Sequence, residues 1–296
     1  MNREPRPLSI GLLGQLSAQL DQTPVTPSAP KQRQVLALLA LNPGRVVTVP
    51  TLIEELWGDR PPRSYATTLQ TYVLQLRNSL AAAQPGNPAV RRILSTRHFG
   101  YVLENTACQT DVDEFQRVAR DGRTAAEAGD VRLASTVLAG ALHLWRGPAL
   151  VDVRKGRVLE IEAASLEEAR LAVFERRIEV DLHLGQHRDM LGELTLAAAK
   201  NPMSENICAF LMLALYRSGH VGRSLQAFHR LRSALVEELG VEPCPRLRRL
   251  QAAILSGDPA LESATAAWPR AEVAAGDPGC PQHGPQLVLQ LLSFGL

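Results

Sequence analysis

This 296-residue sequence lacks long apolar runs, and nothing at its start resembles a secretory signal. No stretch approaches the roughly 20 consecutive apolar residues that a membrane-spanning helix needs. The first seven residues are charged and interrupted by proline, and the short apolar stretch after them contains glycine, which argues against a signal peptide. We therefore expect no membrane partner and a cytoplasmic location.

Cysteine is also scarce, and the four residues stand far apart: Cys108, Cys208, Cys244 and Cys280. They form no CxxC pair, so neither a disulfide framework nor a zinc cluster is expected, and this usage fits a reducing cytoplasm. Aromatic residues make up only 4% of the chain, whereas hydrophobic residues make up 45%. The core must therefore consist mostly of leucine, alanine and valine, a composition that favours helices over sheets.

Catalytic and metal-binding motifs are missing as well. The sequence contains no GxxxxGK[ST] loop for nucleotide phosphates and no supported Ser-His-Asp or Cys-His arrangement. His183 and His187 have a spacing that suits a metal, but Gly185 and Gln186 mark a helix end between them and no carboxylate completes the site. We predict that the protein is not an enzyme and has no metal site and no cofactor.

Acidic residues are few in the first third of the chain. Residues 1–107 contain 11 lysines and arginines but only 6 acidic residues, whereas residues 108–257 contain 20 of each, and residues 258–296 contain 1 basic and 4 acidic residues. A basic excess confined to one segment indicates a polyanionic partner for that segment.

The order of predicted elements in this basic segment is that of a winged helix. Residues 8–25 contain short apolar runs broken by turn signals and predict a small β-meander. A first helix over residues 30–41 stops at Asn42-Pro43-Gly44, and a second follows Thr48 and ends at Gly58. A third helix covers residues 65–80. Two β-rich runs within residues 90–103 flank a short turn and predict a hairpin.

The third helix has one apolar stripe and one polar face. Its stripe has helical spacing and consists of Ala66, Leu69, Val73, Leu76 and Leu80. The opposite face carries Ser64, Thr67, Thr71, Leu74, Gln75 and Asn78, flanked by Arg63, Gln70 and Arg77. Such side chains offer donors and acceptors for base edges and cations for phosphates, without carboxylates that repel DNA. The alternative is a neutral amphipathic helix that only packs.

Other cations extend the candidate DNA surface. Lys31 and Arg33 stand at the start of the first helix, where they either bind phosphate or form a solvated helix end. Arg97 and His98 fall at the tip of the predicted wing, near a phosphate backbone or minor groove. Leu74 either touches a thymine methyl group or is simply an exposed leucine.

The remainder of the chain is predicted to be helical as far as residue 255. Seven amphipathic segments alternate with Gly-Asp, Gly-Pro, Asn-Pro and Ser-Gly punctuation, and residues 211–228 resemble the helix-turn-helix unit of a tetratricopeptide repeat. Such helix pairs stack into solenoids that bind proteins, or form a bundle with an internal role only. Residues 258–285 are rich in Pro, Gly, Ala and Asp and are predicted to be disordered. The apolar residues 287–296 fit a short docking helix, to which the sequence assigns no role.

Several segments together resemble one known family. They are residues 30–33 (PKQR), 56–62 (LWGDRPP), 68–73 (TLQTYV), 100–101 (GY), 144–150 (LWRGPAL) and 237–243 (EELGVEP). Over about residues 8–261 the chain resembles the Streptomyces antibiotic regulatory proteins, short activators of secondary metabolism. The resemblance implies a mainly α protein with an OmpR-type winged helix over residues 1–107, a bacterial transcriptional activator domain of tetratricopeptide-like helices over residues 108–257, and a tail over residues 258–296.

The resemblance also implies a mechanism. Members of the family bind direct repeats in double-stranded DNA near the promoter −35 region, place the third helix in the major groove, and contact RNA polymerase holoenzyme, through its sigma factor and alpha subunit. The protein is then expected to be a homodimer at least on DNA, and nucleoid-associated. The family usually has a basic residue where Gln75 stands, and often another at Asn78, so this chain departs from the pattern there.

A second hypothesis comes from another class of protein. The same sequence fits a helical-repeat adaptor that acts mainly by binding protein, with a weak or vestigial DNA-binding domain. The neutral side chains of Gln75 and Asn78 are its main support.

Overall fold

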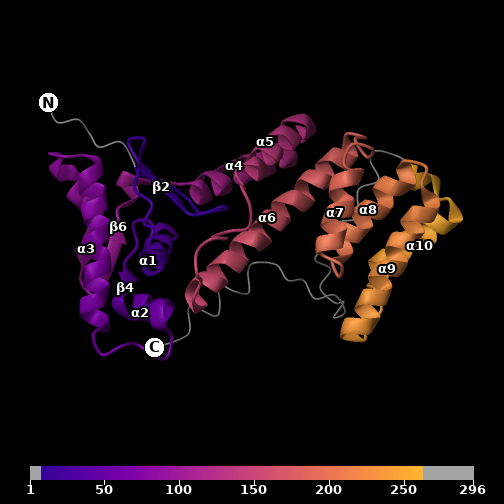
Figure 1. Cartoon of the computed structure of the whole chain (residues 1–296). Coiled ribbons are helices and arrows are strands. Elements are labelled where there is room, and N and C mark those ends of the chain that lie inside the picture. The colour runs from indigo at the N-terminus through magenta and orange to yellow at the C-terminus, as the bar shows by residue number, and fades with distance from the viewer. Residues whose placement is uncertain (1–7, 263–296) are drawn as a thin grey trace. The chain divides into compact units, whose positions relative to one another are not determined.

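The computed structural model describes residues 8–262, and within them the chain forms two compact units (Figure 1). The first unit comprises residues 8–120 and 139–171, and the second comprises residues 121–138 and 172–262. The predicted fold class is confirmed, because most elements are helices and the strands are short. No helix within residues 8–262 has the length and apolar character that a bilayer crossing needs.

The first unit contains two small sheets. One has the order β3-β2-β1-β7 and is built from β1 (Leu8–Gly11), β2 (Ser17–Leu20), β3 (Thr23–Pro24) and β7 (Cys108–Thr110). Strands β1 to β3 are the predicted meander, and Asp21 and Gln22 adopt the positive φ angles of a tight turn, 49° and 68°. Strand β7 pairs in parallel with β1 and was not expected from the sequence.

The predicted winged helix follows the meander. It consists of α1 (Pro30–Ala40), β4 (Val47–Thr48), α2 (Val49–Trp57), α3 (Tyr65–Ala83), η1 (Pro88–Arg92), β5 (Leu94–Arg97) and β6 (Gly100–Leu103), with η2 (Asn105–Ala107) after it. The hydroxyl of Thr48 accepts a hydrogen bond from the amide of Thr51 and caps α2. Gly100 lets β6 approach β4, since a Cβ there would lie 2.1 Å from the carbonyl oxygen of Val47.

Helix α3 buries most of its predicted stripe. Leu69, Val73, Leu76 and Leu80 are buried, as expected, and α3 packs against α1. Ala66 is exposed, so its assignment to the stripe was wrong. The reason is that residues 61–67 are all exposed, which shows that the first turn of α3 extends past the hydrophobic core.

A later part of the chain binds the turn between β1 and β2. The carboxylate of Asp111 accepts hydrogen bonds from the amides of Leu12 and Leu13, at 2.7 and 3.1 Å. The amide of Arg146 donates to the carbonyl oxygen of Leu13 at 2.8 Å, and its guanidinium lies 2.6 Å from Asp111. Residues far apart in sequence therefore satisfy the polar backbone of this turn.

A buried carboxylate in α2 caps α6 (Arg157–His183). Glu55 is 2% exposed, and its two oxygens accept hydrogen bonds from the amides of Gly156 and Leu159, at 2.6 and 2.9 Å. Amides at a helix N-terminus have no partner within the helix, and the helix dipole also favours a negative charge there. Gly156 is required for this contact, because a Cβ there would lie 2.3 Å from the carbonyl oxygen of Glu55.

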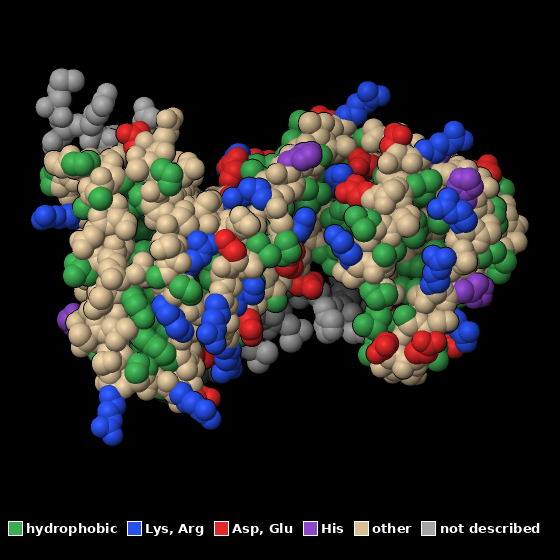
Figure 2. Space-filling model, viewed as in Figure 1, with side chains coloured by type: hydrophobic (Ala, Val, Ile, Leu, Met, Phe, Trp, Pro, Cys, Tyr) green, Lys and Arg blue, Asp and Glu red, His purple; other side chains and the backbone are tan. Residues whose placement is uncertain are grey.

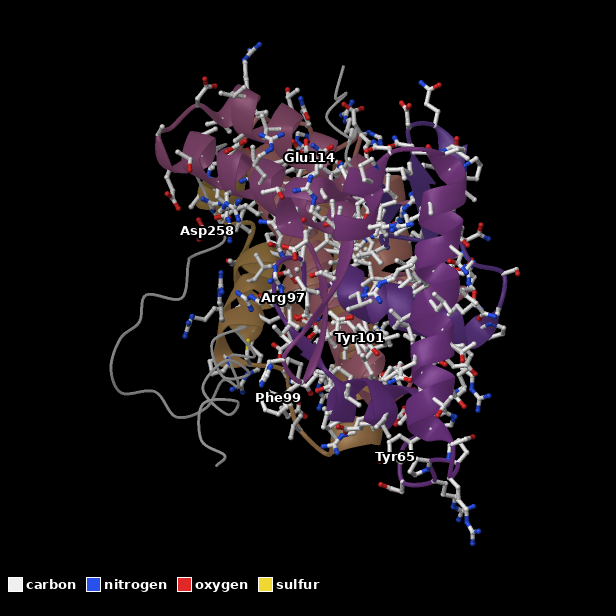
Figure 3. The ribbon with its side chains drawn as sticks, turned by 90° about the vertical axis from the view of Figure 1, so that its left-hand side faces the viewer. Tyr65, Arg97, Phe99, Tyr101, Glu114 and Asp258 are labelled. Carbon is white, nitrogen blue, oxygen red and sulfur yellow. The ribbon has the colours of Figure 1, made fainter. Side chains whose placement is uncertain are left out.

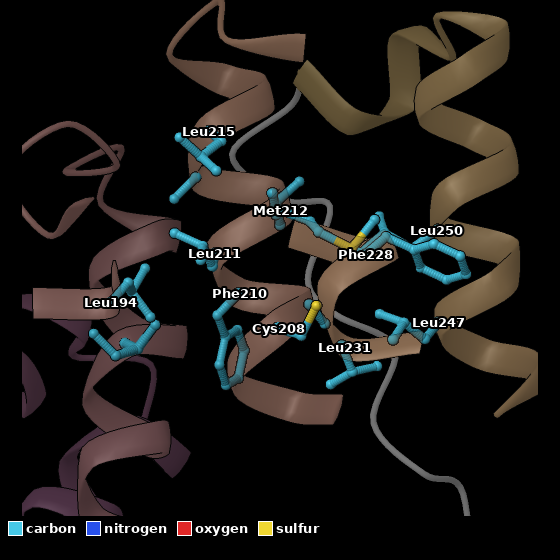
Figure 4. Packing of buried hydrophobic residues seen from close by; sticks show 14 of the residues in the cluster. Leu194, Cys208, Phe210, Leu211, Met212, Leu215, Phe228, Leu231, Leu247 and Leu250 are labelled. Atoms are coloured by element: carbon cyan, nitrogen blue, oxygen red, sulfur yellow. The ribbon is translucent and has the colours of Figure 1, made fainter. Parts of the chain in front are cut away.

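The seven predicted helices after the winged helix are present. Besides α6 they are α4 (Asp111–Glu127), α5 (Val131–His143), α7 (Leu191–Lys200), α8 (Glu205–Arg217), α9 (Val221–Leu239) and α10 (Pro245–Ser256). In the second unit α8 is the central helix, because every residue from 207 to 215 is buried. Figure 4 shows Leu194 of α7 on one side of α8, and Phe228 of α9 and Leu247 of α10 on the other.

The start of the predicted tail is ordered into a short helix, η3 (Pro259–Glu262). The guanidinium of Arg217 donates to the carbonyl oxygen of Leu261 at 2.8 Å, which explains the difference from the expected disorder at residues 258–262. The rest of that prediction, including the docking helix at residues 287–296, lies outside the described residues.

The cap formed by Glu55 is expected to stabilise the fold. The substitution Glu55→Ala removes the acceptor for two buried amides and should lower the free energy of unfolding by about 2–4 kcal/mol. Chemical denaturation of the full chain measures the loss. Glu54→Ala is the matched control, because Glu54 is half-exposed and only 3.5 Å from Arg157 in a surface ion pair. We expect it to change stability by less than about 0.5 kcal/mol; equal losses for both variants would refute the structural role of Glu55.

Candidate nucleic-acid interface

The polar face of α3 is uncovered. The predicted contact residues that are exposed on it or just before it are Arg63, Ser64, Thr67, Thr71, Gln75 and Asn78. The whole of α3 contains no acidic residue. In Figure 2 the surface of the first unit around α3 is mainly tan and green, with few red side chains. This face is therefore free to approach a polyanion without carboxylate repulsion.

Internal hydrogen bonds use some of the polar groups on this face. The hydroxyl of Thr71 donates to the carbonyl oxygen of Thr67, and that of Thr68 donates to the carbonyl oxygen of Ser64, both at 2.9 Å. The amide oxygen of Gln75 accepts a hydrogen bond from Gln32 of α1. The helix thus presents fewer free donors and acceptors than its sequence suggests.

Arg77 connects α3 with the wing. Its Nε donates to the carbonyl oxygen of Leu94 at 2.9 Å, and its Nη2 donates to the hydroxyl of Thr96 at 2.8 Å. The guanidinium also lies 6.0 Å from the centre of the Tyr101 ring. The sequence predicted Arg77 to contact DNA; the structure shows it holding β5 and β6 beside α3.

The wing tip carries exposed basic and aromatic side chains. The side chain of Arg97 is 58% exposed and forms an ion pair with Glu104 at 2.8 Å. Hydrogen bonding from Ser95, and then the guanidinium of Arg97, lowers the pKa of Glu104. His98 and Phe99 are both exposed (Figure 3 labels Arg97 and Phe99), and their rings meet edge to face at 4.9 Å.

Phe99 was not singled out from the sequence. It is 79% exposed and has a φ angle of +66°, which is uncommon for a residue with a side chain. Its carbonyl oxygen accepts a hydrogen bond from the amide of Val49 at 2.9 Å, which fixes the wing tip against the start of α2.

Lys31 and Arg33 face other parts of the protein. The ammonium group of Lys31 donates to the carbonyl oxygen of Leu56 and lies 5.9 Å from the Trp57 ring. Burial, followed by the charge of Arg154, lowers the pKa of Lys31. The side chain of Arg33 is 15% exposed and forms an ion pair with Asp152. A phosphate contact by either residue would require these bonds to break.

Further exposed arginines in the winged helix were missed. They are Arg45, Arg60, Arg91 and Arg92. The only sequence signal for them is the basic excess of residues 1–107, which does not show which side chains are exposed.

Two of the cysteines are chemically quiet. Burial raises the pKa of the Cys108 and Cys208 thiols to about 12, so both stay protonated at neutral pH. Among residues 8–262 no group of three His, Cys, Asp or Glu side chains is arranged to hold a metal ion.

Two family models match the chain. Residues 23–103 match the family described as transcriptional regulatory protein, C terminal, and residues 110–255 match the bacterial transcriptional activator domain.

Curated relatives match both parts together. The regulatory protein DnrI of Streptomyces peucetius is 49% identical over 86% of this chain and 94% of its own length. The transcriptional regulator RedD of Streptomyces coelicolor is 34% identical, over 88% of this chain and 74% of its own. A solved structure of Mycobacterium tuberculosis EmbR, in complex with a low affinity phosphopeptide, superposes with a TM-score of 0.79 at 34% identity. That match covers 86% of this chain and 66% of the EmbR chain.

The hydrogen bonds of Arg77 are expected to stabilise the fold and to position the wing for DNA binding. Arg77→Lys keeps the positive charge but loses the forked pair of hydrogen bonds to Leu94 and Thr96. We expect it to lower the free energy of unfolding by about 1–2 kcal/mol and to weaken DNA binding with an unchanged salt dependence. Urea denaturation and binding titrations at several salt concentrations measure both effects.

The control is Arg91→Lys, which changes an exposed arginine of η1 and should leave both quantities unchanged. A direct phosphate contact by Arg77 would give the opposite pattern. Arg77→Lys would then resemble the unmodified protein, and Arg77→Ala would lower the salt slope by about 1.

Proposed function

We propose that this chain, which belongs to the Streptomyces antibiotic regulatory protein family of transcriptional activators, binds promoter DNA through α3 and the wing. The observation that carries the proposal is the exposed, acid-free outer face of α3, connected by Arg77 to an exposed basic wing tip. An α-helix fits the major groove of B-DNA, and a wing beside it reaches the adjacent backbone or minor groove.

The residues proposed to contact DNA are the exposed ones on these two elements: Arg63, Ser64, Thr67, Thr71, Gln75, Asn78, Arg97 and His98. Arg63 and Arg97 neutralise phosphates, whereas the polar residues of α3 face base edges. Gln75 and Asn78 are neutral where the family usually has basic residues, so base contacts rather than phosphate contacts are assigned to them.

The proposed DNA sites are direct repeats near the −35 region of promoters for secondary metabolite genes. Residues 1–107 form the DNA-binding part, and residues 108–257 form the activator part, which contacts the sigma factor and alpha subunit of RNA polymerase holoenzyme. Two copies then bind side by side on DNA at the nucleoid. Family membership supports these assignments, because DnrI and RedD carry the names of regulators and match over both parts.

The proposal predicts a steep salt dependence of DNA binding. Each neutralised phosphate releases counterions, so Arg63→Ala and Arg97→Ala should each reduce the slope of log K against log salt by about 1. The measurement is a titration of the full chain against duplex promoter fragments from the neighbouring biosynthetic genes, at several salt concentrations.

Arg232→Ala is the matched control, because Arg232 is an exposed arginine of α9 whose guanidinium pairs with Glu242. It should leave the slope unchanged. Activation of these promoters by a chain that binds none of them would refute the proposal and favour the protein-binding adaptor.

A further inference from the structure

Leu74 is an apolar side chain in the middle of the proposed DNA-binding face. It is 56% exposed and lies three residues after Thr71 and four residues before Asn78, so the three side chains are neighbours on the outer face of α3. A single exposed leucine is ordinary on a protein surface. The side chains around Leu74, however, suggest that it contacts a particular base.

The hydroxyl donor beside Leu74 and one amide acceptor near it are already used within the protein. The Thr71 hydroxyl donates to the carbonyl oxygen of Thr67 at 2.9 Å, so its only hydrogen is not available to a base. Thr71 is left with its methyl group and the acceptor lone pairs of its hydroxyl oxygen. On the neighbouring side of the helix the amide oxygen of Gln75 accepts from Gln32. The part of the face around Leu74 and Thr71 is therefore more apolar than its sequence suggests.

Only one base offers an apolar group at the floor of the major groove. Thymine presents its C5 methyl group there, whereas guanine, adenine and cytosine present acceptors and amino donors. A leucine placed against those polar groups would remove water from them without replacing its hydrogen bonds, which is unfavourable. Against a thymine methyl the same leucine buries apolar surface on both sides.

We infer that α3 reads thymine through its C5 methyl group, with Leu74 as the specificity-determining contact and the methyl group of Thr71 beside it. This inference rests on the proposed function, because it requires α3 to lie in the major groove. It adds the chemical class of the base that is recognised and the residue that recognises it.

The test removes one methyl group at a time from the DNA. The probe is an unmethylated synthetic duplex with the sequence that the full chain selects from a random DNA pool, in which each thymine in turn is replaced by deoxyuridine. At the contacted position we expect this change to raise the Kd of the unmodified protein by about threefold to tenfold, since a buried methyl group contributes about that much.

The second half of the test changes the protein. Leu74→Ala should bind the thymine duplex about threefold to tenfold more weakly than the unmodified protein does, and it should lose most of the discrimination between the thymine and deoxyuridine duplexes. Alanine has a high helix propensity, so α3 remains helical. Leu74→Met keeps an apolar side chain of similar volume and should restore the discrimination. The matched control is Leu133→Ala, which removes a half-exposed leucine of α5 and should keep the full discrimination.

The outcomes separate this inference from the proposed function. If no sequence is selected from the pool, DNA recognition itself fails, and the inference with it. If a sequence is selected but no deoxyuridine replacement changes its affinity, only the methyl readout is overturned. The methyl readout would also be overturned if the Leu74→Ala variant discriminated between the thymine and deoxyuridine duplexes as well as the unmodified protein does.

Discussion

The carboxylate of Glu55 is the contact on which the arrangement of the first unit depends. It lies in the last turn of α2, and it caps the first amides of α6. Gln34 of α1 donates to the same carboxylate at 3.2 Å, so one buried acid joins α1, α2 and the start of α6. Loss of the donors would leave the Glu55 carboxylate buried without hydrogen bonds, and loss of the carboxylate would leave the buried amides of α6 without an acceptor. Helices α1 and α2 are therefore held by residues from the part of the chain that matches the bacterial transcriptional activator domain.

Positive side chains in this unit have two different tasks. Lys31, Arg33 and Arg77 stabilise the fold, since each donates to carbonyl, carboxylate or hydroxyl oxygens of other elements. Arg63 and Arg97 are exposed, although Arg97 must exchange its ion pair with Glu104 to contact a polyanion. Of the half-buried group only Arg77 connects α3 with the wing, whereas the exposed group is the one proposed to attract DNA phosphates. From the sequence alone all five are expected to contact DNA, and the structure adds intramolecular partners for Lys31, Arg33, Arg77 and Arg97.

Much of the fold could be predicted from the sequence, because it depends on local patterns. Helical spacing indicated Leu69, Val73, Leu76 and Leu80 as buried, and the hairpin and the later helices followed from turn signals and periodicity. The contacts that could not be predicted join residues far apart in the chain. Glu55 stands beside Glu54 and has the same local sequence signal, yet one is buried at a helix terminus and the other is half-exposed. The partners of Arg33 and Arg77 could not be predicted either, because they are also distant in the sequence. The face of α3 could be predicted, but its internal hydrogen bonds could not.

In the proposed complex α3 lies in the major groove while the wing lies beside it. Dimethyl sulfate footprinting of the full chain on its promoter tests both parts at once, because the reagent methylates guanine N7 in the major groove and adenine N3 in the minor groove. We expect protection of guanine N7 within the binding site and of adenine N3 next to it. Binding that leaves every guanine N7 in the site reactive would contradict it.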